Sequence, residues 1–402
     1  MSDAVAPVDA LVIGAGPAGL MAAEVLAAAG CNVILAEAKP SVGRKLLMAG
    51  KSGLNLTNAG GLDAVLSSFG DRAAMLEPMI RAFGPDQICR WATTLEQPLF
   101  TGSTGRVFPR AMKASPLLRA WLARLSGLGV EVRTRWRWTG WDGADVLFDT
   151  AEGPRRLRPA VTVIATGGAS WARLGADGAW AAITAADGVA MAPFRPANGG
   201  LLVNWAEPMQ RHFGTPVKAV SLTAGEQTSR SEFVISARGL EGGGIYSVFS
   251  AVRDGAPLAL DLQPDRSVSE VAARLSRPRG KASLSNHLRK TLKLLPVQIA
   301  LLQEFARPLP ADAEQLAAIL KAVPVAHCGP RPLDEAISTA GGVPFAALDA
   351  GLMMRKRPGT FIAGEALDWE APTGGFLLTA CLSTGHWAGQ QAVTYRNAGQ
   401  AE

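Results

Sequence analysis

The feature that most constrains the fold is a glycine-rich turn between two short apolar segments near the start of the chain. An apolar run at 10–13 is followed by GAGPAG at 14–19 and then by a segment of small residues at 20–29. A second apolar run at 32–36 ends in Glu37. Buried parallel strands are short continuous apolar runs, so this pattern predicts a strand, a helix and a second parallel strand.

GxGxxG in this position is typical of a dinucleotide site. Gly14 would make the tight turn, Gly16 would let the backbone approach a pyrophosphate, and Gly19 would let the helix pack on the strand. The free N–H groups at the start of that helix suit phosphates. Glu37 lies 18 residues beyond Gly19 and can accept both ribose hydroxyls. A carboxylate there disfavours a 2′-phosphate, which favours NAD or FAD over NADP.

The length of the chain and the distribution of apolar runs along it predict more than one domain. A chain of 402 residues suggests two or three domains, and 48% hydrophobic with 18% charged residues excludes a disordered chain. Strand-like apolar runs recur at 161–165 and near 360, with a small-residue helix at 377–395. The pattern therefore predicts one α/β domain, 1–190 and 333–402, interrupted by an insertion at 191–332. The expected insertion is mostly β and barrel-like over about 191–262 and helical over about 267–322.

Several classes of protein are disfavoured. The four cysteines form no CxxC and the four histidines no HExxH, so we expect neither a metal site nor a disulfide scaffold. No apolar stretch reaches the roughly 20 residues that a membrane span needs. The first ten residues contain no Lys or Arg, so they do not predict a signal peptide. We therefore expect a cytoplasmic protein that does not bind a membrane.

Polar and glycine-rich loops follow several of the predicted strands. The segment 43–58 combines three basic residues with three glycines and several hydroxyl and amide side chains. Such donors suit a pyrophosphate or the polar edge of a flavin, although a solvated loop would look the same. Further glycine-rich loops lie at 166–168, 364–368 and 373–378, the last of which precedes the final predicted helix.

Together these segments resemble one family. GAGPAGLMAAEVLAAAG, GRKLLMAGKSGLNLTN, GRVFPRAMKAS, ATGGAS, DEAISTAGGV and GEALDWEAPTGGFLLTACLSTGHWAG occur in this order. In this they are similar to the BaiN/YhiN-type NAD(P)/FAD-dependent oxidoreductases. The resemblance implies a Rossmann-like FAD-binding domain of the glutathione-reductase type with an inserted second domain.

The resemblance also implies which residues hold FAD. The ADP half would be held by the first glycine turn and Glu37, the adenine side by the backbone of Trp138, and the flavin by the last glycine loops. The predicted cofactor-binding residues are Gly14, Gly16, Pro17, Ala18, Gly19, Glu37, Ala38, Arg44, Lys45, Ser52, Gly53, Asn55, Trp138, Thr166, Gly167, Gly168, Gly364, Glu365, Asp368, Gly375, Phe376, Leu377 and Leu378.

Two departures from the family pattern lie at the expected flavin edge. Many members carry Cys-Asn where this chain has Leu54-Asn55, and Gly-Tyr-Asn where it has Gly375-Phe376-Leu377. These differences indicate a divergent subgroup, to which the substrates of other members transfer poorly.

The expected reaction is hydride transfer between flavin N5 and a small organic substrate. The resemblance implies reduction of a carbonyl-conjugated double bond, with NAD(P)H as the eventual donor. Because the chain has no second GxGxxG, a nicotinamide would visit the flavin only transiently, or another donor would serve. The sequence identifies no catalytic acid or base. His327 is a candidate to face the flavin, Tyr246 to project from the insertion toward a ligand, and Lys51 to lie near flavin N1, but each also suits a structural or solvated role.

Two basic features leave other functions open. Arg133, Arg135 and Arg137 alternate along a predicted strand, which would place them on one face. Seven basic residues and no acidic ones lie within 271–303. Each feature is typical of a solvated face, and an anionic partner is the alternative. A small molecule is the expected partner, while a flavin-dependent tRNA-modifying or RNA-binding protein and a non-catalytic flavin redox sensor are the alternatives. The basic residues in question are Arg274, Arg277, Arg279, Lys281, Arg289, Lys290 and Lys293.

Overall fold

The chain forms two units, each with its own core. The structure is a computed structural model that describes residues 6–51 and 53–400. Unit 1 runs to Pro196 and resumes at Ile337, and unit 2 is Ala197–Ala336. Each unit has a separate cluster of buried apolar side chains. The predicted boundaries, after 190 and after 332, fall a few residues before those of the two units.

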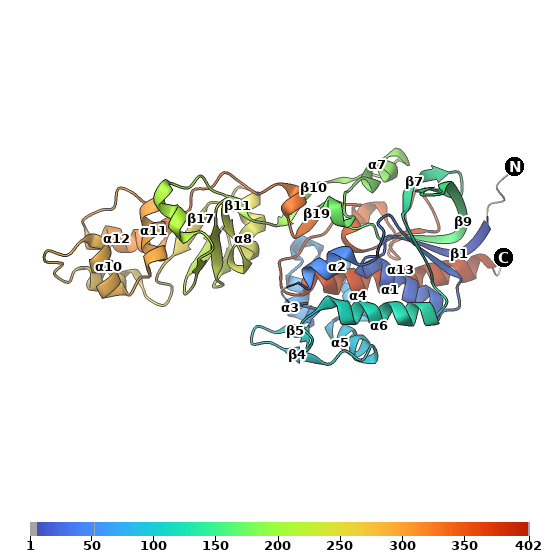
Figure 1. Ribbon diagram of the computed structural model, residues 1–402, viewed down its shortest axis with the longest axis horizontal. Helices are drawn as coiled ribbons and strands as arrows, with labels where there is room; N and C mark the ends of the chain where they lie inside the picture. Colours follow the sequence, from blue (N-terminus) through green and yellow to red (C-terminus); the bar gives the residue numbers. More distant parts are fainter. Residues whose placement is uncertain (1–5, 52, 401–402) are drawn as a thin grey trace. The chain divides into compact units, whose positions relative to one another are not determined.

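A parallel sheet forms the centre of unit 1 (Figure 1), in the order β6-β2-β1-β9, with β20 also paired to β9. All of these pairings are parallel. The apolar runs recognised in the sequence form buried parts of its inner strands, and the Rossmann-like fold class is thereby confirmed. The five strands are β1 (Ala6–Ile13), β2 (Val33–Glu37), β6 (Glu131–Thr134), β9 (Gly153–Ile164) and β20 (Thr360–Ile362).

The long strand β9 belongs to two kinds of ladder. Its last eight residues pair with β1 in parallel, and its first five pair with β8 (Asp145–Thr150) in antiparallel. β8 pairs in turn with β7 (Trp136–Asp142). The sequence predicted a strand only at 161–165. The earlier part of β9 was missed because Arg155, Arg156 and Arg158 interrupt its apolar character.

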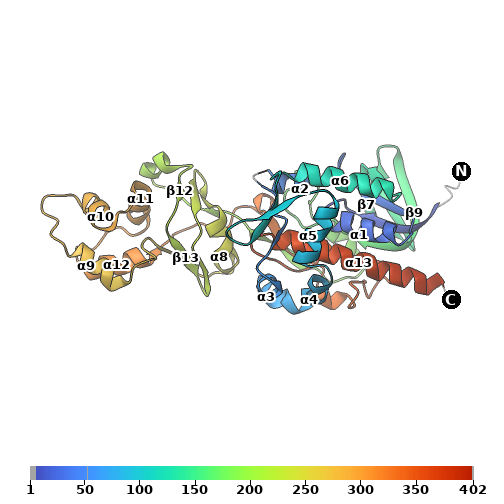
Figure 2. The same cartoon turned by 90° about the horizontal axis from the view of Figure 1, so that it is seen from below.

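Two helices pack against each other unusually closely. α1 (Pro17–Ala28) and α13 (Phe376–Gln400) lie side by side (Figures 1 and 2). A Cβ atom on Gly385 would lie 2.3 Å from the carbonyl oxygen of Ala18, and one on Gly389 would lie 2.9 Å from Cβ of Val25. The small residues of the last helix therefore serve packing against the nucleotide-turn helix.

Shorter elements complete unit 1. Its other helices are α2 (Arg44–Ala49), α3 (Leu62–Ser67), α4 (Ala73–Ala82), α5 (Pro85–Thr94), α6 (Ala114–Gly127) and α7 (Trp180–Ala186). Its other strands are β3 (Thr57–Asn58), β4 (Leu99–Thr101), β5 (Arg106–Pro109), β10 (Ala192–Asn198), which runs into unit 2, and β19 (Ser338–Gly342). β3, β5 and β4 form a small antiparallel sheet, and β10 pairs with β19.

One helix contains an internal proline, and one local expectation was wrong. Pro78 lies inside α4, where burial of Leu76, Met79 and Ile80 outweighs one missing backbone hydrogen bond. Arg133, Arg135 and Arg137 do not share one strand face, because Arg135 has a φ of +60° and forms the turn between β6 and β7.

Unit 2 contains two four-stranded sheets and a group of helices. The sheet orders are β11-β16-β15-β12 and β14-β13-β17-β18, and their pairings are antiparallel. The strands are β11 (Leu201–Leu202), β12 (Pro216–Val217), β13 (Ser221–Ala224), β14 (Gln227–Ser229), β15 (Phe233–Ser236), β16 (Gly239–Glu241), β17 (Leu258–Asp261) and β18 (Val323–Pro324). The helices are α8 (Gly243–Arg253), α9 (Val268–Leu275), α10 (Leu284–Leu292), α11 (Pro296–Phe305) and α12 (Ala313–Lys321).

The packing of α1 on α13 predicts that Gly385→Ala destabilises the protein. The new methyl group would overlap the Ala18 carbonyl, so we expect the free energy of unfolding to fall by about 1–3 kcal/mol. Gly399→Ala is the matched control, since it lies in the same helix with open space around it. We expect no loss of stability there. Equal urea midpoints for Gly385→Ala and the wild type would contradict the packing argument.

Candidate functional site

The turn between β1 and α1 uses its three glycines in different ways. Gly14 has a φ of +101°, and a Cβ atom on it would lie 2.4 Å from the carbonyl oxygen of Ala165. A Cβ atom on Gly19 would lie 1.8 Å from the carbonyl oxygen of Gly14. Gly16, by contrast, has nothing within 4 Å of its Cβ position. Two glycines therefore allow the backbone to pack, while Gly16 borders open space at the start of α1.

Glu37, at the end of β2, is fixed beside this turn. One of its carboxylate oxygens accepts the backbone N–H of Ala15 at 3.1 Å, and the other accepts that of Lys39 at 2.8 Å. Burial raises the pKa of the Glu37 carboxyl, although these two N–H donors and the charges of Lys39 and Arg44 oppose the rise. Each oxygen keeps a lone pair, so the carboxylate can still accept hydroxyl groups.

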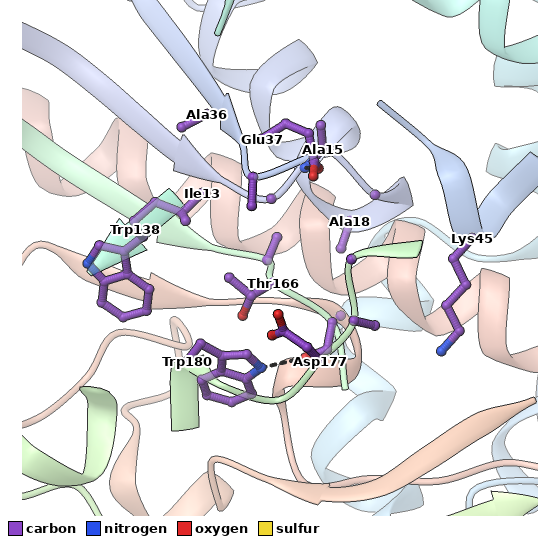
Figure 3. Close-up of a pocket in the computed structure, with 18 of the residues that line it drawn as sticks. Ile13, Ala15, Ala18, Ala36, Glu37, Lys45, Trp138, Thr166, Asp177 and Trp180 are labelled. Atoms are coloured by element: carbon purple, nitrogen blue, oxygen red, sulfur yellow. Dashed lines mark hydrogen bonds between the residues drawn. The ribbon is translucent and has the colours of Figure 1, made fainter. Parts of the chain in front are cut away.

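A pocket of about 320 Å³ opens at the carboxyl ends of β1 and β2 (Figure 3). This volume is within the range of about 300–1,000 Å³ that is typical of small-molecule sites. Thirteen predicted site residues line it, namely Gly14, Gly16, Pro17, Ala18, Glu37, Ala38, Arg44, Lys45, Trp138, Thr166, Gly167, Gly364 and Glu365. Gly19 supports the turn from behind, through its contact with Gly14.

Two polar atoms of lining residues are buried without a hydrogen-bond partner among the described residues. They are Nε of Arg44 and the hydroxyl oxygen of Thr166. Buried polar groups are nearly always paired in folded proteins, so unpaired ones beside a pocket point to a polar ligand. Figure 3 shows Thr166 inside the pocket, near Trp180 and Asp177.

Aromatic side chains border another part of the pocket. Trp138 donates from its indole N–H to the carbonyl of Gly140 at 3.0 Å, and Trp180 donates to that of Gly167 at 2.9 Å. The ladder between β7 and β8 is irregular between Trp138 and Gly140, which leaves Thr139 out of the regular pairing. Thr139 lines the pocket, so a ligand can reach backbone groups that the ladder does not use.

A hydrogen-bonded network closes the pocket near α2. The ammonium of Lys45 lies 3.0 Å from a carboxylate oxygen of Glu365 and 3.0 Å from the hydroxyl oxygen of Ser170. The other oxygen of Glu365 accepts the backbone N–H of Thr339 at 3.2 Å. Cys381 of α13 also lines the pocket, and burial raises the pKa of its thiol far above the usual range. The network places one cation and one anion at this end.

The remaining predicted residues lie away from the pocket lining. Asp368 forms an ion pair with Arg72 at 2.6 Å, and Gly168 packs against Thr339. Ser52 lies outside the described residues. The others that do not line the pocket are Gly53, Asn55, Gly375, Phe376, Leu377 and Leu378.

The segment that contains Asn55 meets the start of α13. The hydroxyls of Thr57 and Thr379 lie 2.8 Å apart, and the amide of Asn58 donates to the carbonyl of Gly374 at 3.1 Å. Gly375 fits here because a Cβ atom would lie 2.5 Å from the backbone of Thr57. Oδ1 of Asn55 is buried without a partner among the described residues. The two sequence segments expected at the flavin edge are thus brought together.

The other candidates of the sequence, His327 and Tyr246, lie in unit 2. The backbone N–H of Gly329 donates to Nδ1 of His327 at 3.1 Å, and burial lowers the pKa of this imidazole. Burial raises the pKa of the Tyr246 hydroxyl. His327 therefore has a local partner in its own turn, and a catalytic role for either residue stays a prediction.

Some lining residues were missed by the sequence analysis. They come from β7, from the segment 174–179 and from the first turn of α7, and they include Trp136, Arg137, Asp177 and Trp180. Gly140, a glycine within a strand, was a usable signal for the irregularity at Thr139. Nothing in the sequence indicated that residues 174–183, which end in the first turn of α7, line the pocket.

Among residues 6–51 and 53–400, no helix is both long and apolar enough to cross a membrane. The same residues contain no cluster of three His, Cys, Asp or Glu side chains that could hold a metal ion.

Known proteins share the sequence pattern and the fold. Residues 8–391 match the family described as HI0933-like protein Rossmann domain. The chain is 26% identical over 406 residues to the 3-dehydro-bile acid delta(4,6)-reductase of Clostridium scindens, covering 95% of this chain and 98% of the reductase.

Two solved structures have a similar fold. Sdh1 of Mycobacterium smegmatis, in complex with UQ1, has a TM-score of 0.52 at 16% identity, covering 98% of this chain and 69% of Sdh1. The 3-ketosteroid delta1-dehydrogenase of Sterolibacterium denitrificans has a TM-score of 0.50 at 12% identity, covering 96% and 99%. The family match confirms the family predicted from the sequence. The chain therefore belongs to the HI0933-like family of Rossmann-domain proteins and is, as predicted, an oxidoreductase.

Proposed function

We propose that the pocket of unit 1 binds FAD and that the protein is a flavin-dependent reductase of a small organic molecule. The observation that carries this proposal is the open space at Gly16 beside a fixed Glu37 carboxylate. The unpaired buried atoms of Arg44 and Thr166 add donors that such a ligand would satisfy. The residues of the pocket therefore fit a dinucleotide.

Each part of the pocket suits one part of the cofactor. The turn at 14–18 and the guanidinium of Arg44 would hold the pyrophosphate, because N–H groups and a cation favour phosphate oxygens. Glu37 would accept the ribose hydroxyls, and the backbone at Trp138 and Thr139 would meet the adenine edge. Gly364, Glu365 and Lys45 would hold the flavin half, together with Thr166 and Gly167. Ser52, Gly53, Asn55 and Gly375–Leu378 stay predicted contacts of the flavin.

FAD, when bound, supplies hydride transfer at its N5 atom. The residues of the chain would orient the cofactor and place charge beside it. The Lys45 ammonium, fixed by Glu365 and Ser170, would stabilise negative charge at this end of the pocket. No histidine lines the pocket among the described residues, so the lining provides no imidazole as a general acid.

For the substrate we propose a double bond conjugated to a carbonyl, with NAD(P)H as donor. The support is the similarity, over nearly the whole of both chains, to a protein named as a delta(4,6)-reductase of a 3-dehydro-bile acid. Because the chain has a single GxGxxG, the nicotinamide would visit the flavin without a Rossmann domain of its own. The test is anaerobic reduction by NADH or NADPH, followed by turnover with an enone or menadione.

One observation favours the RNA-binding alternative. The seven basic residues between 274 and 293 have no ion pair with a carboxylate among the described residues, and six of them are exposed. They lie on α9, α10 and the loop and turn that follow these helices. Unpaired cations of this density attract polyanions, so a second role in RNA binding is a distinct candidate.

A prediction for the cofactor pocket concerns Gly16→Ala. The backbone angles of Gly16, φ −85° and ψ −177°, suit alanine, and no protein atom is close, so the fold should persist. The added methyl group would take space that the cofactor needs. We expect affinity for FAD to fall about 10- to 100-fold, from the roughly 1–3 kcal/mol that overpacking costs. Flavin fluorescence titration of the deflavinated protein measures this.

Gly127→Ala is the matched control, because it also has open space around it and lies far from the pocket lining. It should bind FAD as the wild type does. A purified wild-type protein that is colourless and takes up no FAD would refute the proposed function.

A second prediction concerns Lys45→Met. Loss of the cation beside Glu365 would disfavour the negatively charged reduced flavin, so we expect the midpoint potential to fall by at least about 30 mV. Reduction by NAD(P)H should slow while FAD stays bound. Spectroelectrochemical titration gives the potential, and exposed Lys356 provides the control variant Lys356→Met. An unchanged potential would show that Lys45 does not act on the flavin. If FAD is bound but no donor supports turnover, the redox-sensor alternative is favoured.

A third prediction tests the RNA alternative. Neutralising Arg277, Arg279 and Lys281 to Gln should weaken binding of a mixed tRNA and lower the slope of log affinity against log salt by about 2–3. The matched control neutralises three exposed cations of unit 1, Arg119, Arg355 and Lys356. Absence of binding by micromolar RNA at low salt would reject this function.

A further inference from the structure

A second cavity, of about 430 Å³, adjoins the nucleotide pocket within unit 1. Arg44 and Leu174 line both cavities. The second cavity lies between α2 and the start of α6, two helices that pack together (Figures 1 and 2). Of its lining residues, Arg44 belongs to the predicted cofactor site and Lys51 was a candidate to lie near the flavin, while the others have no role in the proposed reaction.

Among the described residues, the lining of this cavity carries three cations and no carboxylate. The cations are Arg44, Lys51 and Lys113. None of the three has an ion pair with Asp or Glu in the part of the chain that the structure describes. Like charges around one cavity repel one another, and an anion bound among them would offset this repulsion.

The hydrogen bonds of these cations leave donors free. Arg44 donates from Nη1 to the hydroxyl oxygen of Ser41 at 3.2 Å, while its Nε is buried without a partner. Lys113 donates to the backbone carbonyl of Lys51 at 3.4 Å, which occupies one of its three N–H bonds. The charge of Arg44 interacts with the carboxylate of Glu37. The two oxygens of that carboxylate already accept hydrogen bonds from the backbone N–H groups of Ala15 and Lys39.

Other donors complete the polar side. Ala114 and Ser115, the first residues of the 14-residue helix α6, line the cavity, and no side chain caps this end of the helix. The positive end of the helix dipole adds to the charge of the three cations. The hydroxyl of Ser115 is a further donor.

The opposite part of the lining is apolar. It contains Leu47, Met48 and Leu174, and Leu47 is 39% exposed, which is high for a leucine beside a cavity. A free inorganic ion would not use this surface. A ligand with an anionic group and an organic body would contact both parts.

We propose that this cavity is a binding site for the phosphate group of an organic phosphomonoester. Three cations match a phosphate dianion better than a single carboxylate, because the dianion has two charges and three acceptor oxygens. The guanidinium of Arg44, which the proposed function also assigns to the FAD pyrophosphate, would contribute its positive charge from the side that the two cavities share. The apolar part would contact the organic body of the ligand. The two lysines line only this cavity, and the proposal does not depend on the proposed reaction.

The experiment uses the full-length protein saturated with FAD, so that the first pocket is filled. Isothermal titration calorimetry with adenosine 2′-monophosphate, adenosine and inorganic phosphate distinguishes the groups recognised. We expect the monophosphate to bind, adenosine to bind at least about tenfold more weakly, and high salt to weaken the monophosphate. Inorganic phosphate that competes with the monophosphate, but with lower affinity, also supports the site.

Two double variants make the test specific. Lys51→Gln with Lys113→Gln should lower the affinity for the monophosphate by on the order of 100-fold, about tenfold for each charge-assisted hydrogen bond that the variant removes. Arg355→Gln with Lys356→Gln removes the same charge from exposed positions outside the cavity and should leave the affinity unchanged.

Three results would overturn the proposal. They are equal affinity for adenosine and its monophosphate, an equal decrease in affinity in both double variants, and no binding of any probe. If the protein takes up no FAD, the same titrations on the FAD-free protein still test this cavity, because the lysine variants lie outside the first pocket. Failure of the two proposals is therefore distinguishable.

Discussion

The candidate site depends on the close backbone contact among Gly14, Gly19 and Ala165. The carbonyl oxygens of Gly14 and Ala165 occupy the space that side chains on these glycines would need. This contact fixes the end of β1 against the end of β9 and sets the start of α1 over the sheet. Gly16 is thereby left facing open space, and Glu37 is held beside it by two backbone N–H groups. Without this contact, the turn would have no fixed place for an anion.

The sequence predicted this part of the site because its chemistry is local. The GAGPAG turn and Glu37 lie within one strand–helix–strand unit, where spacing determines position. Trp180 and Asp177 were not predicted, because they belong to the start of α7 and the segment before it, which lie far from the glycine turn in the sequence. The alternation of residues along the strand also failed to predict the positions of the three arginines, because Arg135 has a positive φ and forms a turn. The segment of Asn55 and the start of α13 were both expected at the flavin edge; they meet in unit 1, but their contact with a flavin stays a prediction.

Charge is distributed differently over the two adjoining cavities of unit 1. In the nucleotide pocket, Lys45 is paired with Glu365, and Glu37 is held by backbone donors. In the neighbouring cavity, three cations have no carboxylate partner among the described residues. Arg44 and Leu174 line both cavities, and Arg44 is the charged residue that they share. A ligand in either cavity would therefore alter the electrostatic environment of the other.

The double pairing of β9 restricts how the nucleotide site can vary. A shift of one residue along a strand turns every side chain to the opposite face. In β9 such a shift would break two ladders at once, because the strand pairs with β8 in antiparallel and with β1 in parallel. It would also move Ala165 away from Gly14. The antiparallel pairing of β7, β8 and β9 therefore helps to fix the position of the glycine turn. Insertions and deletions should be tolerated in the turns that join these strands, but not within β9 itself.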